Sequence, residues 1–332
     1  MRFIIAYFKG WWLLFRKFGM WLLLFLFNFI FAMVAAFPLF NLVDSKLSNS
    51  KAIERLLPGL DFTIFQDFMN QFGRVVIVIM NQSFFLTILY LLFSIFLTGG
   101  ILEVFKRSKE RFSFRTFWSG CTYYFWRLLR LTFYFLMIHG FFLALFIGLV
   151  QAILGNPGDW DTEIFMYDTL KIAIPIYLFF ASIFFMIQDY AKIHVVHQDK
   201  WFLMFSFWQS FGLVFKKFFP AFFLYLLNLL TILGVLAAYL FFNPTTIETD
   251  SMIALSFAIG QAFIFARIGT KLLNLGSATM LYQDIMVKEE IINVEENEVV
   301  VVDETIDPIN MNEGTTEIEK RIREEGLDLD VT

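Results

Sequence analysis

The chain has 332 residues, of which 58% are hydrophobic and 47 are Phe, and its mean hydropathy is +0.67. A water-soluble domain cannot hide this much apolar surface, so the composition excludes an ordinary soluble enzyme and predicts a bilayer protein in contact with membrane lipids, with no nucleic-acid partner. The net charge is −4, but its two signs are unevenly distributed along the chain. Residues 1–286, the body, are basic, with 22 Lys and Arg and 15 Asp and Glu. Residues 287–332, the tail, are acidic, with 4 Lys and Arg and 15 Asp and Glu.

The body is predicted to cross the membrane six times. Its long intervals without charged residues approach or exceed the ~20 residues that span ~30 Å of hydrocarbon. The N-terminal segment is interpreted as a retained helix, because no convincing cleavage site for a signal peptide follows it. The six predicted spans are residues 20–42, 83–105, 131–154, 170–190, 219–242 and 251–273.

An amphipathic pattern precedes every second span. Residues 114–128 carry one apolar stripe at i, i+4, i+7, i+11 and i+14, which predicts an interfacial helix leading into a span. The same five offsets recur in residues 4–18 and 204–218. The pattern therefore predicts three elbow-plus-hairpin repeats, residues 1–112, 113–200 and 201–286, with parallel order. The stripes are Ile4, Phe8, Trp11, Phe15 and Phe18; Phe114, Trp118, Cys121, Phe125 and Leu128; and Met204, Trp208, Phe211, Phe215 and Phe218.

A cation stands near the end of each stripe, namely Lys17, Arg127 and Lys217. Lys and Arg also gather in the loops on this side of the predicted spans, whereas the opposite loops around residues 159–168 and 248–250 are acidic. The positive-inside pattern places this side, and both termini, in the cytoplasm. We therefore expect Lys17, Arg127 and Lys217 to contact lipid headgroups at the cytoplasmic face of the membrane.

The first outer loop, residues 44–74, is too long for a plain connection. Its phenylalanines line one helical face and its polar residues another, which predicts a short helix on the outer surface. That helix could be a packing element at the interface or a lid over a cavity between the spans.

Polar side chains within the spans are candidates for a functional site, because they are costly in hydrocarbon. His139, Asn28 and Asn228 are predicted at similar depths in the third, first and fifth spans. They could line a substrate or proton path, or they could hydrogen-bond between packed helices.

Asp189 and Arg267 are predicted near the cytoplasmic ends of the fourth and sixth spans. They could form a salt bridge between the second and third units, which would neutralise both charges. Alternatively, Asp189 could pair with Lys192 on its own helix at i+3. A third interpretation assigns Arg267 to an anionic lipid headgroup.

Motifs for metal, cofactor or covalent chemistry are absent from the sequence. His194 and His197 form an HxxH pair, but no further zinc ligands are suitably spaced, so we expect neither metal nor cofactor. No nucleophile motif, Walker A motif or GxGxxG occurs, and the single cysteine, Cys121, excludes an internal disulfide. The glycines of TGGILEVF, residues 98–105, could serve close helix packing or act as a hinge.

The tail, residues 287–332, has high negative charge and no aromatic residue, which predicts a solvated and largely disordered segment. A short helix could begin near Thr316 and end at Gly326. The tail could dock a basic cytoplasmic protein or fold against the basic elbows.

Three segments together resemble a group of uncharacterised bacterial six-span membrane proteins, similar to the membrane domain associated with some glycerophosphodiester phosphodiesterases. These segments are TGGILEVF, RFSFRTFWSGCTYYFWRLLRL and QDYAKIHVV, at residues 98–105, 111–131 and 188–196. The resemblance covers residues 1–286 and implies an integral membrane domain. It implies no phosphodiesterase activity, since the chain has no phosphodiesterase domain.

The sequence therefore predicts an all-α polytopic membrane helical bundle without catalytic residues. We expect a transport or lipid-handling role first. The alternatives are a scaffold or regulatory subunit acting through the acidic tail and, with less support, an intramembrane enzyme using His139.

Overall fold

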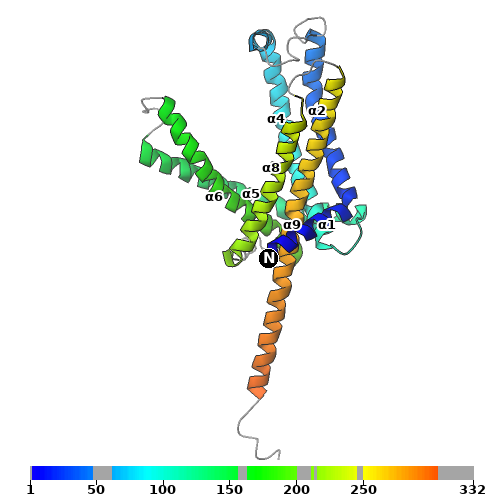
Figure 1. The fold of residues 1–332 in the computed structure, drawn as a ribbon, viewed down its shortest axis with the longest axis vertical. Helices are drawn as coiled ribbons and strands as arrows, with labels where there is room; N and C mark the ends of the chain where they lie inside the picture. Colours follow the sequence, from blue (N-terminus) through cyan, green and yellow to red (C-terminus); the bar gives the residue numbers. More distant parts are fainter. Residues whose placement is uncertain are drawn as a thin grey trace, which may run out of the picture. The chain divides into compact units, whose positions relative to one another are not determined.

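The computed structural model describes residues 2–47, 62–155, 163–199, 211–212, 215–244 and 250–305. Over these residues it contains seven α-helices and no strand, which confirms the all-α prediction (Figure 1). The helices are α1 (Arg2–Arg16), α2 (Phe18–Leu47), α4 (Phe62–Lys106), α5 (Phe114–Leu154), α6 (Glu163–Gln198), α8 (Phe218–Phe242) and α9 (Asp250–Thr305).

Six of these helices, all except α1, are long and apolar enough to cross a bilayer, so the protein is a multi-pass membrane protein. Each contains one of the six predicted spans, but most extend well beyond it. The short surface helix predicted within residues 44–74 is the beginning of α4, which continues without a break to Lys106. Once a helix has formed, each further residue adds a hydrogen bond at little entropic cost, which favours this continuity.

The three predicted elbows differ in structure. The first is a separate helix, α1, and the chain turns at Lys17 before α2 begins. The prediction that the second elbow is a separate helix is wrong, because residues 114–128 form the first turns of the unbroken α5. Most of the third lies outside the described residues, although Lys217 again occupies a turn immediately before α8. Whether the three units are true repeats stays a prediction.

The chain divides into two compact units, Met1–Tyr282 and Gln283–Thr332. Helix α9 extends to Thr305 and so continues into the first part of the predicted tail. The short helix predicted from Thr316 lies outside the described residues.

Helices α4 and α5 pack closely through their small residues. A Cβ atom on Gly100 would lie 2.5 Å from Cys121 Sγ and 2.6 Å from the carbonyl oxygen of Phe117. A Cβ atom on Gly120 would lie 2.6 Å from Glu103 Cβ. Such distances exclude any side chain, so these glycines allow the two backbones to touch, and close packing accounts for the TGGILEVF glycines.

Helix α9 is held by α1 and α2. The indole of Trp21 stacks on Phe265, with ring centroids 4.3 Å apart, and its Nε1 donates to the Phe265 carbonyl oxygen at 2.9 Å. Gly10 of α1 lies against Ser277, where a Cβ atom would approach Ser277 Cβ to 2.8 Å. Figure 1 shows α1 crossing the ends of the spans at a steep angle.

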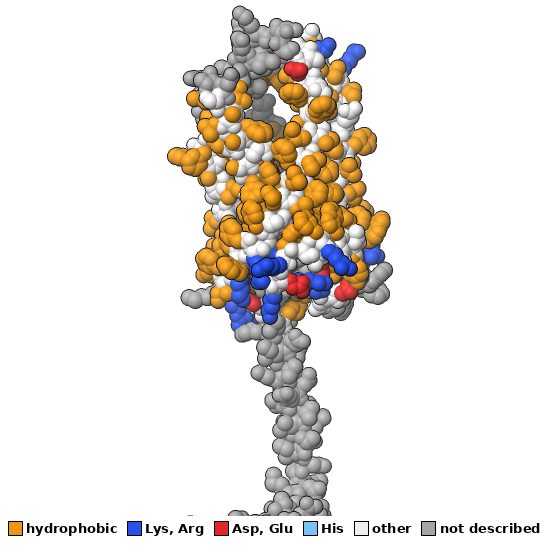
Figure 2. Space-filling model, turned by 90° about the vertical axis from the view of Figure 1, so that its right-hand side faces the viewer, with side chains coloured by type: hydrophobic (Ala, Val, Ile, Leu, Met, Phe, Trp, Pro, Cys, Tyr) orange, Lys and Arg blue, Asp and Glu red, His pale blue; other side chains and the backbone are white. Residues whose placement is uncertain are grey.

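Hydrophobic side chains cover the outside of the spanning helices. Phe141, Phe85 and Phe241, on three different helices, are 72%, 73% and 82% exposed. Figure 2 shows these apolar side chains over the length of one face, with Lys and Arg gathered at the end where α1 lies. In a membrane this surface contacts lipid, and the basic end lies at an interface.

The α4–α5 contact predicts a sharp difference between two glycines. Gly100→Ala is expected to lower the free energy of unfolding by about 1–3 kcal/mol, because the new methyl group meets backbone as well as side chain. Gly148→Ala in α5, where nothing lies within 4 Å, is the control and should be neutral or stabilising by up to ~1 kcal/mol. Unfolding in detergent micelles measures both, and equal stabilities would contradict the close contact.

Candidate functional site

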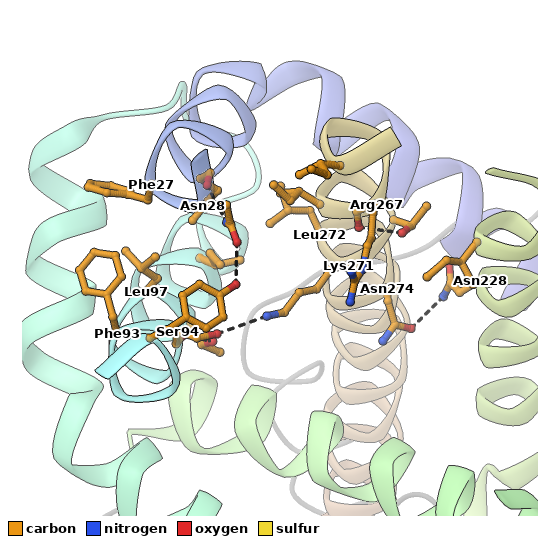
Figure 3. Close-up of a pocket in the computed structure, with 18 of the residues that line it drawn as sticks. Phe27, Asn28, Phe93, Ser94, Leu97, Asn228, Arg267, Lys271, Leu272 and Asn274 are labelled. Atoms are coloured by element: carbon orange, nitrogen blue, oxygen red, sulfur yellow. Dashed lines mark hydrogen bonds between the residues drawn. The ribbon is translucent and has the colours of Figure 1, made fainter. Parts of the chain in front are cut away.

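A cavity of about 590 Å³ lies between α2, α4, α6, α8 and α9 (Figure 3). Three of the predicted intramembrane residues line it, namely Asn28, Asn228 and Arg267. The volume is within the range of roughly 300–1,000 Å³ typical of small-molecule sites. The cavity is therefore the strongest candidate for a ligand site in the part of the chain that the structure describes.

The cavity is amphipathic. One set of lining side chains is aliphatic or aromatic and comes from every contributing helix except α6, which contributes Ser182. The other set is polar and comes from all five helices, with both cations on α9. The principal apolar members are Leu24, Phe27, Phe93, Leu97, Leu229 and Ile232. The polar members from the other helices include Asn28, Tyr90, Ser94, Thr98, Tyr225 and Asn228.

Two cations of α9 project into this cavity, Arg267 and Lys271, one helical turn apart (Figure 3). Lys271 Nζ donates to Ser94 Oγ across a long distance of 3.4 Å. The guanidinium of Arg267 makes no hydrogen bond or ion pair with any residue that the structure describes. No Asp or Glu is among the described residues that line the cavity.

Asp189 of α6 lines a smaller cavity of about 170 Å³, which shares Ser94, Lys271 and Asn274 with the first. Its carboxylate accepts three hydrogen bonds. Lys192 Nζ donates to Oδ1 at 3.1 Å, while Tyr225 Oη and Asn274 Nδ2 donate to Oδ2 at 3.0 and 3.1 Å. Of the two pairings considered from the sequence, the structure shows Asp189 with Lys192 and not with Arg267.

Asn228 extends this polar network along α8 and α9. Its Nδ2 donates to Asn274 Oδ1 and to Ser277 Oγ, both at 3.1 Å. Asn228 Oδ1 is buried and has no hydrogen-bond partner among the described residues. The network thus links α6, α8 and α9 through side chains alone, as interhelical hydrogen bonds do in membrane proteins.

Asn28 belongs to a separate pair on the opposite wall of the cavity. Tyr90 Oη of α4 donates to Asn28 Oδ1 at 2.6 Å, and Asn28 Nδ2 donates to the Leu24 carbonyl oxygen at 2.7 Å. Its amide is thereby satisfied within the protein, so its principal contribution is to join α2 to α4.

His139 is not part of this site. Its Nδ1 bonds with the Phe135 carbonyl oxygen at 2.8 Å, and its ring lies 4.7 Å from that of Phe185 and 5.7 Å from that of Phe184. The buried Nε2 has no partner among the described residues. Of the three residues considered for a polar path, Asn28 and Asn228 line the cavity and His139 does not.

The three predicted headgroup cations also differ from expectation. Lys17 is buried, and its Nζ donates to the carbonyl oxygens of Arg107 and Glu110. Burial, aided by neighbouring Arg16, lowers the pKa of Lys17 from its ordinary value. Lys17 therefore ties the α1–α2 turn to the segment after α4, and headgroup contact is wrong for it.

Arg127 is likewise buried and pairs with Asp199, which also accepts a hydrogen bond from Tyr123 at 3.0 Å. Partial burial of Asp199 opposes its ionisation, but the hydrogen bonds from Arg127 and Tyr123 outweigh it and lower the pKa of the carboxyl group. Headgroup contact is wrong for Arg127 as well. Lys217 is half-buried, and its headgroup role stays a prediction.

The two histidines of the HxxH pair form hydrogen bonds with other groups of this chain. His194 Nδ1 bonds with Tyr282 Oη at 2.8 Å, and His197 Nδ1 bonds with the Ile193 carbonyl oxygen at 3.1 Å. Within the described ranges, no three His, Cys, Asp or Glu side chains cluster as metal ligands do.

The sequence pattern does not identify several residues that line the cavity, and Lys271 is the most important of these. Arg267, Lys271 and Asn274 stand at i, i+4 and i+7, a spacing that places them on one helical face. The sequence shows this polar stripe, and Arg267 and Lys271 both lie within the predicted span 251–273, but it does not show that a cavity faces them. Tyr90, Ser94 and Tyr225 gave no such signal, because isolated hydroxyl-bearing residues are common in spans.

The Asp189 network predicts an asymmetric response to mutation. Asp189→Ala leaves three donors without their acceptor and is expected to cost about 3 kcal/mol of unfolding free energy. Lys192→Met leaves Tyr225 and Asn274 to bond the carboxylate, and should cost only about 1 kcal/mol. Chemical unfolding in mixed micelles measures both variants, and equal losses would mean that the ion pair alone matters.

Comparisons with known proteins assign no role to these residues. No family model, curated protein or solved structure matches the chain. The resemblance to bacterial six-span membrane domains thus stays a prediction, and the function has to be argued from the chemistry of the cavity.

Proposed function

We propose that this protein handles an amphiphilic lipid or lipid-like substrate within the bacterial cytoplasmic membrane, as a transporter or lipid-binding protein. The observation that carries the proposal is the cavity of about 590 Å³ enclosed by five spanning helices. Its apolar lining residues suit hydrocarbon, and its polar lining residues, with two cations among them, suit a headgroup. Most ligand sites combine such an apolar lining with a few convergent polar groups.

The placement of charge supports an orientation for this function. The turns and helix ends around α1, the end of α4 and the start of α5 carry many Lys and Arg, and Figure 2 shows them gathered at one end. Under the positive-inside rule this end is cytoplasmic, which places both termini in the cytoplasm. The polar wall around Arg267 and Lys271 would then lie toward the inner leaflet.

A scaffold or regulatory role is the second candidate, and the continuation of α9 to Thr305 favours it. The last apolar span ends at Met286, so α9 extends 19 residues past it. Residues 287–332 carry 15 acidic and 4 basic side chains, which suits a basic cytoplasmic protein as partner.

The intramembrane enzyme has the least support. The ring of His139 contacts two phenylalanines, and its Nδ1 bonds to its own helix. An acid–base catalyst needs a partner within hydrogen-bond reach of a substrate, and the residues around His139 supply apolar contacts instead.

Filling the cavity tests the lipid-handling function. Ile232→Trp on α8 adds a large side chain at the cavity wall, and should reduce co-purifying lipid several-fold because the added ring occupies the space that an acyl chain needs. Leu240→Trp on the same helix is the control, since Leu240 is 65% exposed on the lipid-facing surface. Mass spectrometry of lipid extracted from equal amounts of folded protein provides the measurement.

Equal lipid content in Ile232→Trp, Leu240→Trp and the wild type would contradict the proposal. A density map in lipid nanodiscs gives an independent result, in which an elongated ligand between α4, α8 and α9 is expected. An empty cavity there would favour the scaffold.

Deleting residues 287–332 separates the two candidate functions. A lipid-handling protein should keep its bound lipid and thermal stability after the deletion, because the cavity lies wholly within residues 24–274. A scaffold should lose its partner in a pull-down with the full-length chain as reference. Loss of cavity lipid on deletion would contradict an independent lipid site.

A further inference from the structure

The two cations in the cavity lack compensating negative charge. Arg267 and Lys271 both face a space enclosed by spanning helices, and none of the described residues lining that space is acidic. A charged side chain within a membrane costs several kcal/mol unless it is paired or reaches the interface. Both side chains are exposed, so the pair presents positive charge that the described residues lining the cavity do not neutralise.

Asp189 does not supply the missing charge. It lines the adjoining cavity with Lys271, but its carboxylate is already bonded to Lys192, Tyr225 and Asn274. Asp189 and Lys192 neutralise each other at 3.1 Å. Counting the two cavities together, Arg267 and Lys271 remain in excess.

Arg267 and Lys271 lie at a depth in the membrane that suits contact with a lipid headgroup. At about 1.5 Å per residue, Arg267 and Lys271 lie about 26 and 32 Å along α9 from its first residue, Asp250. Hydrocarbon is about 30 Å thick, so both side chains lie near the end of the span where the other Lys and Arg gather. An anionic group that entered from that leaflet would reach them without crossing the bilayer centre.

We infer that Arg267 and Lys271 bind the anionic phosphate of an amphiphile whose chains occupy the apolar wall of the cavity. This assignment rests on the proposed lipid-handling function and adds the charge of its substrate. Arg267 offers the planar fork that matches two phosphate oxygens, and Lys271 adds a point charge one turn away. Ser94, held by Lys271, supplies a hydroxyl at the same level.

The experiment compares lipids of different charge on the full-length protein in neutral detergent. Phosphatidylglycerol is expected to raise the thermal unfolding midpoint and to appear as a bound adduct in native mass spectrometry, whereas phosphatidylcholine should bind at least tenfold more weakly. Arg267→Gln/Lys271→Gln should lose roughly tenfold in phosphatidylglycerol affinity for each cation removed. Arg267→Lys keeps the charge but loses the fork that contacts two phosphate oxygens, so its affinity should lie between those of Arg267→Gln and the wild type.

Two controls keep the outcomes distinct. Arg111→Gln/Arg115→Gln also removes two cations at the basic end, but neither residue lines the cavity, so its affinity should match that of the wild type. Inorganic phosphate should neither stabilise the protein nor displace the lipid. If phosphate alone acts as well as phosphatidylglycerol, a soluble anion is bound and the lipid assignment is overturned.

Different results would contradict the anionic-headgroup assignment and the lipid-handling function on which it rests. Equal binding of both lipids, unchanged in Arg267→Gln/Lys271→Gln but lost in Ile232→Trp, would overturn the charge assignment and keep the lipid-handling function. Absence of any cavity lipid in the wild type would overturn both. If the double variant unfolds, Arg267→Gln alone tests the same point, since the guanidinium has no described protein partner to lose.

Discussion

Charged groups in a membrane must be neutralised or hydrogen-bonded, and this constraint organises the body of the protein. The carboxylate of Asp189 accepts hydrogen bonds from Lys192, Tyr225 and Asn274, and Lys192 also neutralises its charge. Lys17 and Arg127 meet this constraint through carbonyl oxygens and Asp199. These contacts join helices far apart in the chain, so charges that would destabilise an isolated helix stabilise the assembled bundle.

Close helix packing determines where the cavity can exist. Gly99, Gly100 and Gly120 bring α4 against α5, and Gly269 lets Trp21 lie on α9. The neighbours of these glycines, Thr98 and Ile101 on α4 and Ile268 and Thr270 on α9, line the cavity together with larger residues such as Phe93 and Leu97. Close packing at the glycines therefore holds in place the helices that form the cavity wall.

The sequence predicted helix class and the six spans well, because both follow from composition and from the length of charge-free intervals. It singled out Asn28, Asn228 and Arg267 as candidates, since polar residues in spans are few, and all three line the cavity. It failed for Lys17 and Arg127, because periodicity shows which face a residue occupies but not which distant carbonyl oxygen or carboxylate lies opposite. It also failed at the second elbow, where amphipathicity does not by itself end a helix.

The cations of the basic end therefore have two different roles. Lys17 and Arg127 are bonded within the protein, and their charge contributes to topology and to the packing of helix ends. Arg267 and Lys271 are aimed into a cavity without an acid in its described lining. Both side chains are exposed, so they are open to an anionic partner that Lys17 and Arg127, bonded within the protein, cannot take. The proposed ligand would bring that negative charge, and the apolar lining residues beside the two cations would suit its hydrocarbon.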